Sequence, residues 1–113
     1  MSQLLARITF TIANAASLSD GQALGGRTPS IIMMPSAWTA AALTFQGSHD
    51  GTTYYDLYDE EGTELTVPAS SSRRIVLSST FLTDHKYLKV RSGTAGTPVL
   101  QGAERIIYIE VWE

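Results

Sequence analysis

The sequence predicts an all-β fold, a single antiparallel β-sandwich or jelly roll of about eight strands spanning residues 1–113. Short segments alternate apolar and polar residues with a period of two, and Gly, Asp, Asn and Pro separate them at short intervals. No segment shows helical apolar spacing over a length that would support an independent helix. With 43% hydrophobic and 17% charged residues, the chain can bury one core and falls outside the disordered class.

The predicted strands are rich in β-branched and aromatic residues, which suit a pleated, half-buried surface. In chain order they are residues 6–12, 30–34, 43–46, 52–58, 63–67, 73–77, 87–91 and 105–112. Such short strands at turn-punctuated spacing are typical of a sandwich or jelly roll.

In the N-terminal part, the first strand alternates Ile and Phe with Arg and Thr. Residues 14–28 have a loop composition, with three Gly among small and polar residues. Pro35 ends the second strand because proline has no amide hydrogen for the ladder. Residues 36–42 are too few for an independent helix, so we predict a corner that carries Trp38 inward.

In the middle of the chain, the third and fourth strands are predicted to form a hairpin. Residues 48–51, Ser-His-Asp-Gly, form a reverse-turn sequence in which Gly51 can take positive φ. A second turn, Asp-Glu-Glu-Gly at 59–62, leads into the fifth strand, which Pro68 stops.

In the C-terminal part, Phe81 and Leu82 are expected in a connection, and a Gly-rich loop at 92–102 precedes the last strand. The first and last strands are long and apolar enough to be neighbours, which would bring the two ends of the chain together. The inward-facing positions of the strands define the predicted core. Its members are Ile8, Phe10, Ile12, Leu43, Phe45, Leu88, Val90, Ile107 and Ile109.

Composition disfavours several function classes. The net charge of −3 and scattered Lys and Arg residues disfavour nucleic-acid binding. The absence of Cys excludes disulfides, thiolate catalysis and Cys-ligated zinc. The first 17 residues lack the pattern of a secretory signal, and no run approaches the roughly 18 apolar residues of a membrane span. We therefore expect synthesis in the cytoplasm without export and no membrane partner.

No catalytic, cofactor or metal site is predicted, and we expect no enzymatic activity. Ser48, His49 and Asp50 contain the residue types of a hydrolase triad, but adjacent turn residues splay apart, so a structural turn is the preferred interpretation. His85 lacks the spacing of a metal motif. The acidic cluster lacks the EF-hand spacing and is interpreted as a solvated turn. It comprises Asp56, Asp59, Glu60, Glu61 and Glu64.

Aromatic side chains in the 54–58 segment are candidates for stacking on a sugar or anchoring a protein interface. Alternation places Tyr54 and Tyr58 on one face and Tyr55 on the other, and we expect at least one of the three in the core. The basic residues Arg73, Arg74, Lys89 and Arg91 are either a basic patch or ordinary strand charges that discourage edge pairing.

Two long loops, residues 17–28 and 92–102, are the expected docking segments, because both exceed the usual loop length. Arg27 and Arg91 flank these loops. Arginine and tyrosine are common interface anchors, so the candidate partner-binding residues are Arg27, Arg91, Tyr54 and Tyr58. Replacing either arginine with Ala is expected to weaken attachment while leaving thermal unfolding nearly unchanged.

Two segments resemble small structural proteins of phage and prophage virions. They are ALGGRTPSIIMMPSAWTAAALTFQGSHDGTTYYDLYDEEG at 23–62 and YLKVRSGTAGTPVLQGAERIIYI at 87–109, and together they cover more than half of the chain. The resemblance implies a protein of the virion, made in the bacterial host cytoplasm. It would dock on capsid or tail proteins, as a head decoration or cement protein, a head spike or a tail component, with homo-oligomers also compatible.

A more distant likeness is to discoidin-like, galactose-binding-type jelly rolls. It rests on Leu24-Gly25 and Ile31, on the turn pattern of Ser48, Asp50, Gly51 and Tyr54, and on residues 87–89. This likeness implies an alternative function, a carbohydrate-binding module that uses surface tyrosines and loops. The chain lacks the Cys pair of many such domains, and no sugar-binding Arg is identifiable.

Overall fold

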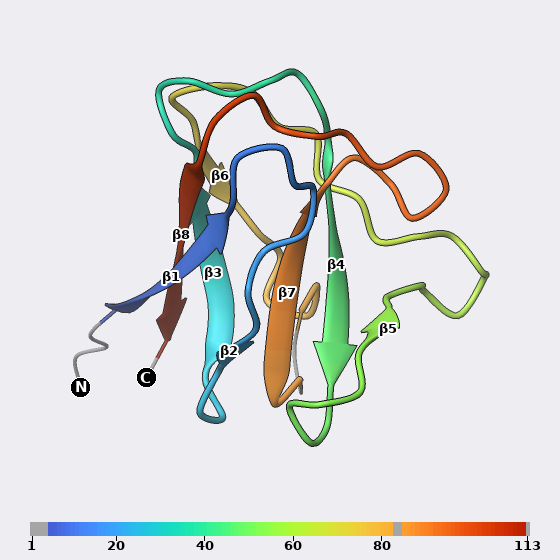
Figure 1. Cartoon of the computed structure of the whole chain (residues 1–113). Coiled ribbons are helices and arrows are strands. Elements are labelled where there is room, and N and C mark those ends of the chain that lie inside the picture. Colours follow the sequence, from blue (N-terminus) through green and yellow to red (C-terminus); the bar gives the residue numbers. More distant parts are fainter. Residues whose placement is uncertain (1–4, 83–84, 113) are drawn as a thin grey trace.

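Alternating apolar residues form eight strands in residues 5–82 and 85–112, which the computed structural model describes (Figure 1). The strands are β1 Leu5–Ile12, β2 Gln22–Ala23, β3 Thr28–Met33, β4 Leu43–Ser48, β5 Tyr55–Asp56, β6 Arg74–Val76, β7 Tyr87–Ser92 and β8 Arg105–Trp112. No helix long and apolar enough to cross a membrane occurs in these two ranges.

The strands form two antiparallel sheets of four, which we call sheet A (β1-β8-β3-β6) and sheet B (β2-β7-β4-β5). The pairing is nested: β1 pairs with β8, β2 with β7, β3 with β6 and β4 with β5. A long hairpin rolled up on itself gives this pattern, which is the topology of a jelly roll. The predicted fold class is therefore confirmed, as is the predicted neighbourhood of the first and last strands.

The hydrophobic core lies between the two sheets. All nine residues predicted for it are buried, and Leu24, Ile32, Leu82 and Val111 join them. Phe45 of β4 meets the ring of Phe81 edge to face, with the centroids 6.0 Å apart and the planes at 84°. Phe81 and Leu82 lie in the connection between β6 and β7, as expected, and from there they reach the core.

The corner at residues 36–42 also agrees with the prediction. Trp38 packs partly buried against the core, and its Nε1 donates a hydrogen bond to the Ala41 carbonyl at 3.1 Å. No helix forms there.

Three strand predictions were wrong. Residues 63–67 form no strand and make only isolated bridges, the return arm at 52–58 shortens to β5, and the 14–28 loop contains β2. At 52–58 and 63–67, backbone amides donate to aspartate side chains and not to a neighbouring strand. Asp50 accepts the amides of residues 52 and 53, and Asp59 accepts those of residues 61 and 63, all at 2.9 Å.

Candidate interaction surfaces

The turn at residues 48–51 is structural, as predicted. Gly51 has φ +79°, and the Ser48 Oγ accepts its amide hydrogen at 2.9 Å. The carboxylate of Asp50 accepts the amides of Thr53 and Thr52, and these hydrogen bonds lower the pKa of Asp50. The Asp50 carboxylate is thus occupied by the turn that it stabilises, and it is not arranged as a member of a triad.

Arg91 lies at the centre of a buried ion-pair network on the outer face of sheet B. Its guanidinium donates to Asp56, to Glu64 at 3.2 Å and to the Thr44 hydroxyl at 3.2 Å. The hydrogen bond from Arg91 lowers the pKa of Asp56 the most, and a hydrogen bond from Gln46 lowers it further. The Arg91 side chain is only 8% exposed. A side chain so placed has little surface to offer a partner.

The acidic cluster therefore divides into two groups. Asp56 and Glu64 are ion-paired, and the Glu64 carboxylate also accepts the Ala95 amide at 3.1 Å, so the solvated-turn interpretation was wrong for these two residues. The remaining three, at 59–61, form an exposed turn as predicted. No group of three His, Asp or Glu residues suited to a metal ion occurs within 5–82 and 85–112.

The tyrosines at 54–58 lie outside the core, so the prediction that at least one is a core residue was wrong. Tyr55 is 70% exposed and Tyr58 is 53% exposed. Tyr54 is partly buried and contacts β7 of sheet B, where the Lys89 ammonium lies 4.4 Å from its ring centroid. Its hydroxyl lies against the backbone at Gly21, where a Cβ would collide with it. Burial raises the pKa of Tyr54.

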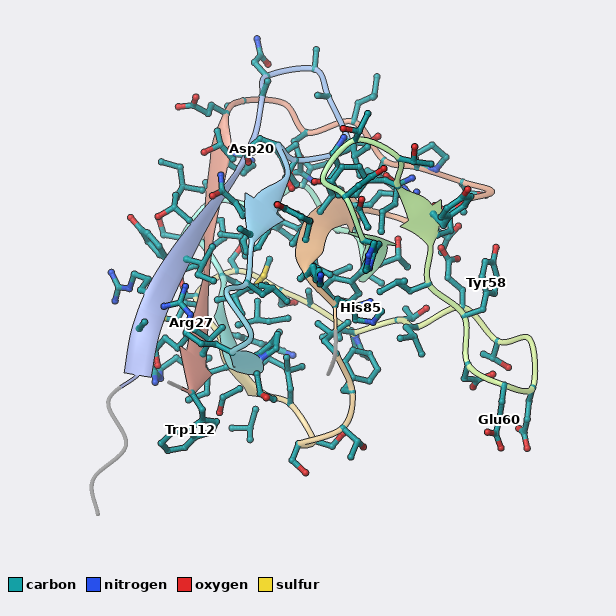
Figure 2. All side chains as sticks on the ribbon, turned by 90° about the horizontal axis from the view of Figure 1, so that it is seen from below. Asp20, Arg27, Tyr58, Glu60, His85 and Trp112 are labelled. Carbon is teal, nitrogen blue, oxygen red and sulfur yellow. The ribbon has the colours of Figure 1, made fainter. Side chains whose placement is uncertain are left out.

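The four candidate partner-binding residues do not form one surface. Arg27 follows the tight turn after β2, and its Nε donates to the Leu24 carbonyl at 2.9 Å. Figure 2 shows Arg27 and Tyr58 on opposite sides of the molecule. Arg91 and Tyr54 belong to the outer face of sheet B, where each contacts residues of its own chain.

The outer face of sheet A carries exposed apolar side chains. An antiparallel sheet usually carries polar residues on its outer side. Here Val76 is 77% exposed, Trp112 41% and Ile106 38%. The strand registers place twelve residues on this face: Arg7, Thr9, Thr11, Thr28, Ile31, Met33, Arg74, Val76, Ile106, Tyr108, Glu110 and Trp112.

The charges on this face are few and mostly paired. Arg74 holds Glu110 with two hydrogen bonds, at 3.0 and 3.1 Å, and this contact lowers the pKa of Glu110. The Arg7 guanidinium lies 4.4 Å from the ring centroid of Tyr108. Two arginines and one glutamate leave the face with a net positive charge in a chain of net charge −3.

The two outer faces thus differ in character. Sheet B carries the Arg91 network and the Tyr54–Lys89 contact, in which polar groups find partners within the chain. Sequence reasoning missed the apolar face of sheet A, although β8 carried a signal. Ile106, Tyr108 and Trp112 alternate with the inward Ile107, Ile109 and Val111, so this strand is apolar on both sides.

A groove of about 520 Å³ opens beside the turn between β4 and β5. Its lining includes His49, Thr53, Tyr55 and His85. It passes close to Gly47, where an added Cβ would lie 2.8 Å from the His85 Nδ1. The groove therefore combines an exposed aromatic ring with polar side chains.

In comparisons with protein-family models, curated proteins and solved structures, nothing matches this chain. The functional argument accordingly starts from the surfaces described above.

Proposed function

We propose that this chain is a non-enzymatic structural protein of a phage particle, which docks on another virion protein through the outer face of sheet A. The observation that carries the proposal is the exposure of Val76, Trp112 and Ile106 on one sheet face. Exposed apolar surface marks interaction sites in soluble proteins where it is continuous, and Ile31, Met33 and Tyr108 share this face with the three exposed side chains. The likeness of residues 23–62 and 87–109 to small virion proteins supports the same role.

The chemistry of the face indicates the kind of partner. The face carries aromatic and aliphatic side chains, and its two arginines outnumber the single Glu110. Aromatic residues and arginine are enriched at protein interfaces, whereas the polar groups of sheet B already bond to each other. The matching surface on a capsid or tail protein would be apolar with an acidic rim.

The test uses particles of the phage that encodes this chain, prepared without it by gene deletion. The purified protein should bind these particles at a fixed stoichiometry in a sedimentation assay. Val76→Asp should weaken binding at least tenfold, because it places a carboxylate in the apolar contact. Leu100→Asp is the comparison variant, since Leu100 is 61% exposed but lies in the 92–102 loop, and weakened binding by Leu100→Asp alone would place the docking surface on that loop.

Two results would contradict the proposal. Failure of the wild-type protein to bind the particles would remove the virion role itself. Equal binding by Val76→Asp and the wild type would place the docking surface away from sheet A.

A second candidate is carbohydrate binding in the groove beside the β4–β5 turn. The specific observation is the 70% exposed Tyr55 at a groove lined by polar side chains, because aromatic rings stack on sugars. A glycan array tests it: saturable binding that Tyr55→Ala abolishes would favour this function. If the protein binds no glycan on the array, the virion role is the better explanation.

A further inference from the structure

The edges of the two sheets differ greatly in length. In the sheets formed by the described residues, β2 and β5 are edge strands of two residues each and β6 is one of three, whereas β1 is an edge strand of eight. Short edges resist pairing with other chains, and a long one invites it unless it is covered or charged. Only β1 is long enough to accept an added strand over several residues.

The backbone groups of β1 that point away from β8 can be identified from Thr11. Its amide donates to the Asp20 carboxylate at 3.0 Å, and its carbonyl accepts the Asp20 amide at 3.2 Å. Outward-pointing residues alternate along an antiparallel edge strand. Arg7 and Thr9 therefore also point outward, and no described residue bonds to their outward backbone groups.

Asp20 thus covers one end of the edge, and no residue within 5–82 and 85–112 bonds to the other. In Figure 2, β1 is the pale blue strand at the left margin, with the Asp20 label near its upper end. Arg7 and Thr9 are both exposed. The charged side chain of Arg7 lies over the Tyr108 ring, on the outer face of sheet A.

We propose that the open edge of β1, from Leu5 to Thr9, receives an extended segment of the partner virion protein, which adds a fifth strand to sheet A. The inference rests on the proposed function and specifies how the partner is held. Adding a strand to an exposed edge is a general mode of peptide recognition, in which backbone hydrogen bonds supply affinity. The added strand carries a carboxylate opposite Arg7.

The carboxylate is inferred from the surroundings of Arg7. Its neighbour across the β1–β8 ladder is Glu110, and that carboxylate is already held by Arg74. Opposite charges on directly opposed strand residues are stabilising. Arg7 interacts with Glu110 electrostatically, but the ion pair of Glu110 is with Arg74, so an acidic residue on the incoming strand would give Arg7 an ion-pair partner of its own.

A second copy of this chain fits the same edge poorly. Antiparallel pairing of two β1 strands centred on Arg7 sets the two guanidinium groups opposite each other, which is destabilising. Moving the centre to Ile8 sets Leu5 of one copy against Thr11 of the other, where Asp20 already occupies the edge. In these two registers, a foreign strand avoids conflicts that a second copy would meet.

The test compares Thr9→Pro with Thr9→Val in the sedimentation assay on particles that lack the chain. Proline removes the outward amide hydrogen without removing a bond to β8, whereas valine keeps it. We expect Thr9→Pro to weaken binding at least tenfold and Thr9→Val to bind within about twofold of the wild type. The Tm of each free variant controls for folding.

A charge variant covers the case in which Thr9→Pro fails to fold. Arg7→Glu alters an exposed side chain and should weaken binding at least tenfold, whereas Arg7→Lys should retain most of it. If the wild type binds the particles and both Arg7→Glu and Thr9→Pro bind equally well, the edge proposal is overturned and the virion role is upheld. A wild-type protein that fails to bind contradicts the virion role itself. A wild-type dimer that Thr9→Pro converts to a monomer in analytical ultracentrifugation would identify the occupant as a second copy, which also overturns the proposal.

Discussion

Arg91→Ala is expected to destabilise the protein strongly, because Arg91 joins three segments from inside the structure. It lies on β7, and its partners belong to β4, to β5 and to the segment at residue 64. The side chains of Arg91 and Glu64 are 8% and 15% exposed, and that of Asp56 is 34% exposed. The deletion would leave two neighbouring carboxylates without their cation.

The magnitude follows from this burial. Removing one partner of a buried ion pair destabilises a protein by about 3–5 kcal/mol. Water reaches a third of the Asp56 side chain, so we expect the lower end of this range, about 3 kcal/mol. For a domain near this size, that corresponds to a fall in Tm of roughly 12 °C. This expectation replaces the one from sequence, in which Arg91→Ala left unfolding nearly unchanged.

Acid should reduce the difference between the two proteins. Arg91 lowers the pKa of Asp56, and a carboxyl with a lowered pKa contributes stability above its unfolded-state pKa of about 3.9. That contribution is lost as the pH falls through the folded-state pKa. The difference in free energy of unfolding between wild type and Arg91→Ala should therefore shrink below about pH 4.

Urea unfolding of both proteins at pH 7 and pH 3 measures the two effects. Arg74→Ala is the matched control, because it removes an arginine from an ion pair whose guanidinium is largely exposed, and its unfolding should change little. A loss below about 1 kcal/mol at pH 7, or a loss of equal size at both pH values, would refute the assigned role of Arg91.

Three further predictions concern the core, the turn and the exposed face. Phe45→Ala should lower the free energy of unfolding by about 3–5 kcal/mol, and a change under about 1 kcal/mol in chemical denaturation would contradict its burial. Gly51→Val should destabilise by roughly 1–3 kcal/mol, because φ +79° strains a β-branched residue, whereas His49→Ala should leave both unfolding and particle binding nearly intact. Loss of particle binding by His49→Ala with the fold unchanged would point to a ligand role for the turn. Val76→Ser should reduce binding of a hydrophobic dye to the free protein; an unchanged dye signal would mean that the apolar face is not what the dye detects.

The strand period was sufficient to predict the core, because one buried face makes every second residue apolar. The inward residues of β1 and β8 follow this rule except for Arg105 at the start of β8, which pairs with Ile12. The period could not reveal the short β2, since two residues carry no alternation. It also could not reveal that Asp50 and Asp59 use their side chains to accept the amides of the residues that follow.

The surroundings of Arg91 could not be predicted for a different reason. Alternation along β7 correctly places Arg91 on the outer face of sheet B, where a strand charge is expected to be exposed. Its burial arises from Asp56 and Glu64, whose segments fold over that face. Such coverage depends on contacts 27 and 35 residues apart in sequence, and local periodicity contains no information about them.

The open edge and the apolar face of sheet A are most consistent with a single interface. Val76 lies on β6 and Arg7 on β1, at opposite edges of the sheet, so about 14 Å separates them at a strand spacing of about 4.8 Å. A strand added along five residues of β1 covers only a narrow strip, whereas a stable protein interface buries about 800 Å² on each partner. Edge pairing alone falls short of that area, and the apolar face alone provides no backbone bonds to fix the register of the partner. A partner that adds a strand to β1 and continues across β8 toward Val76 obtains both, so Thr9→Pro and Val76→Asp should weaken attachment to the same partner.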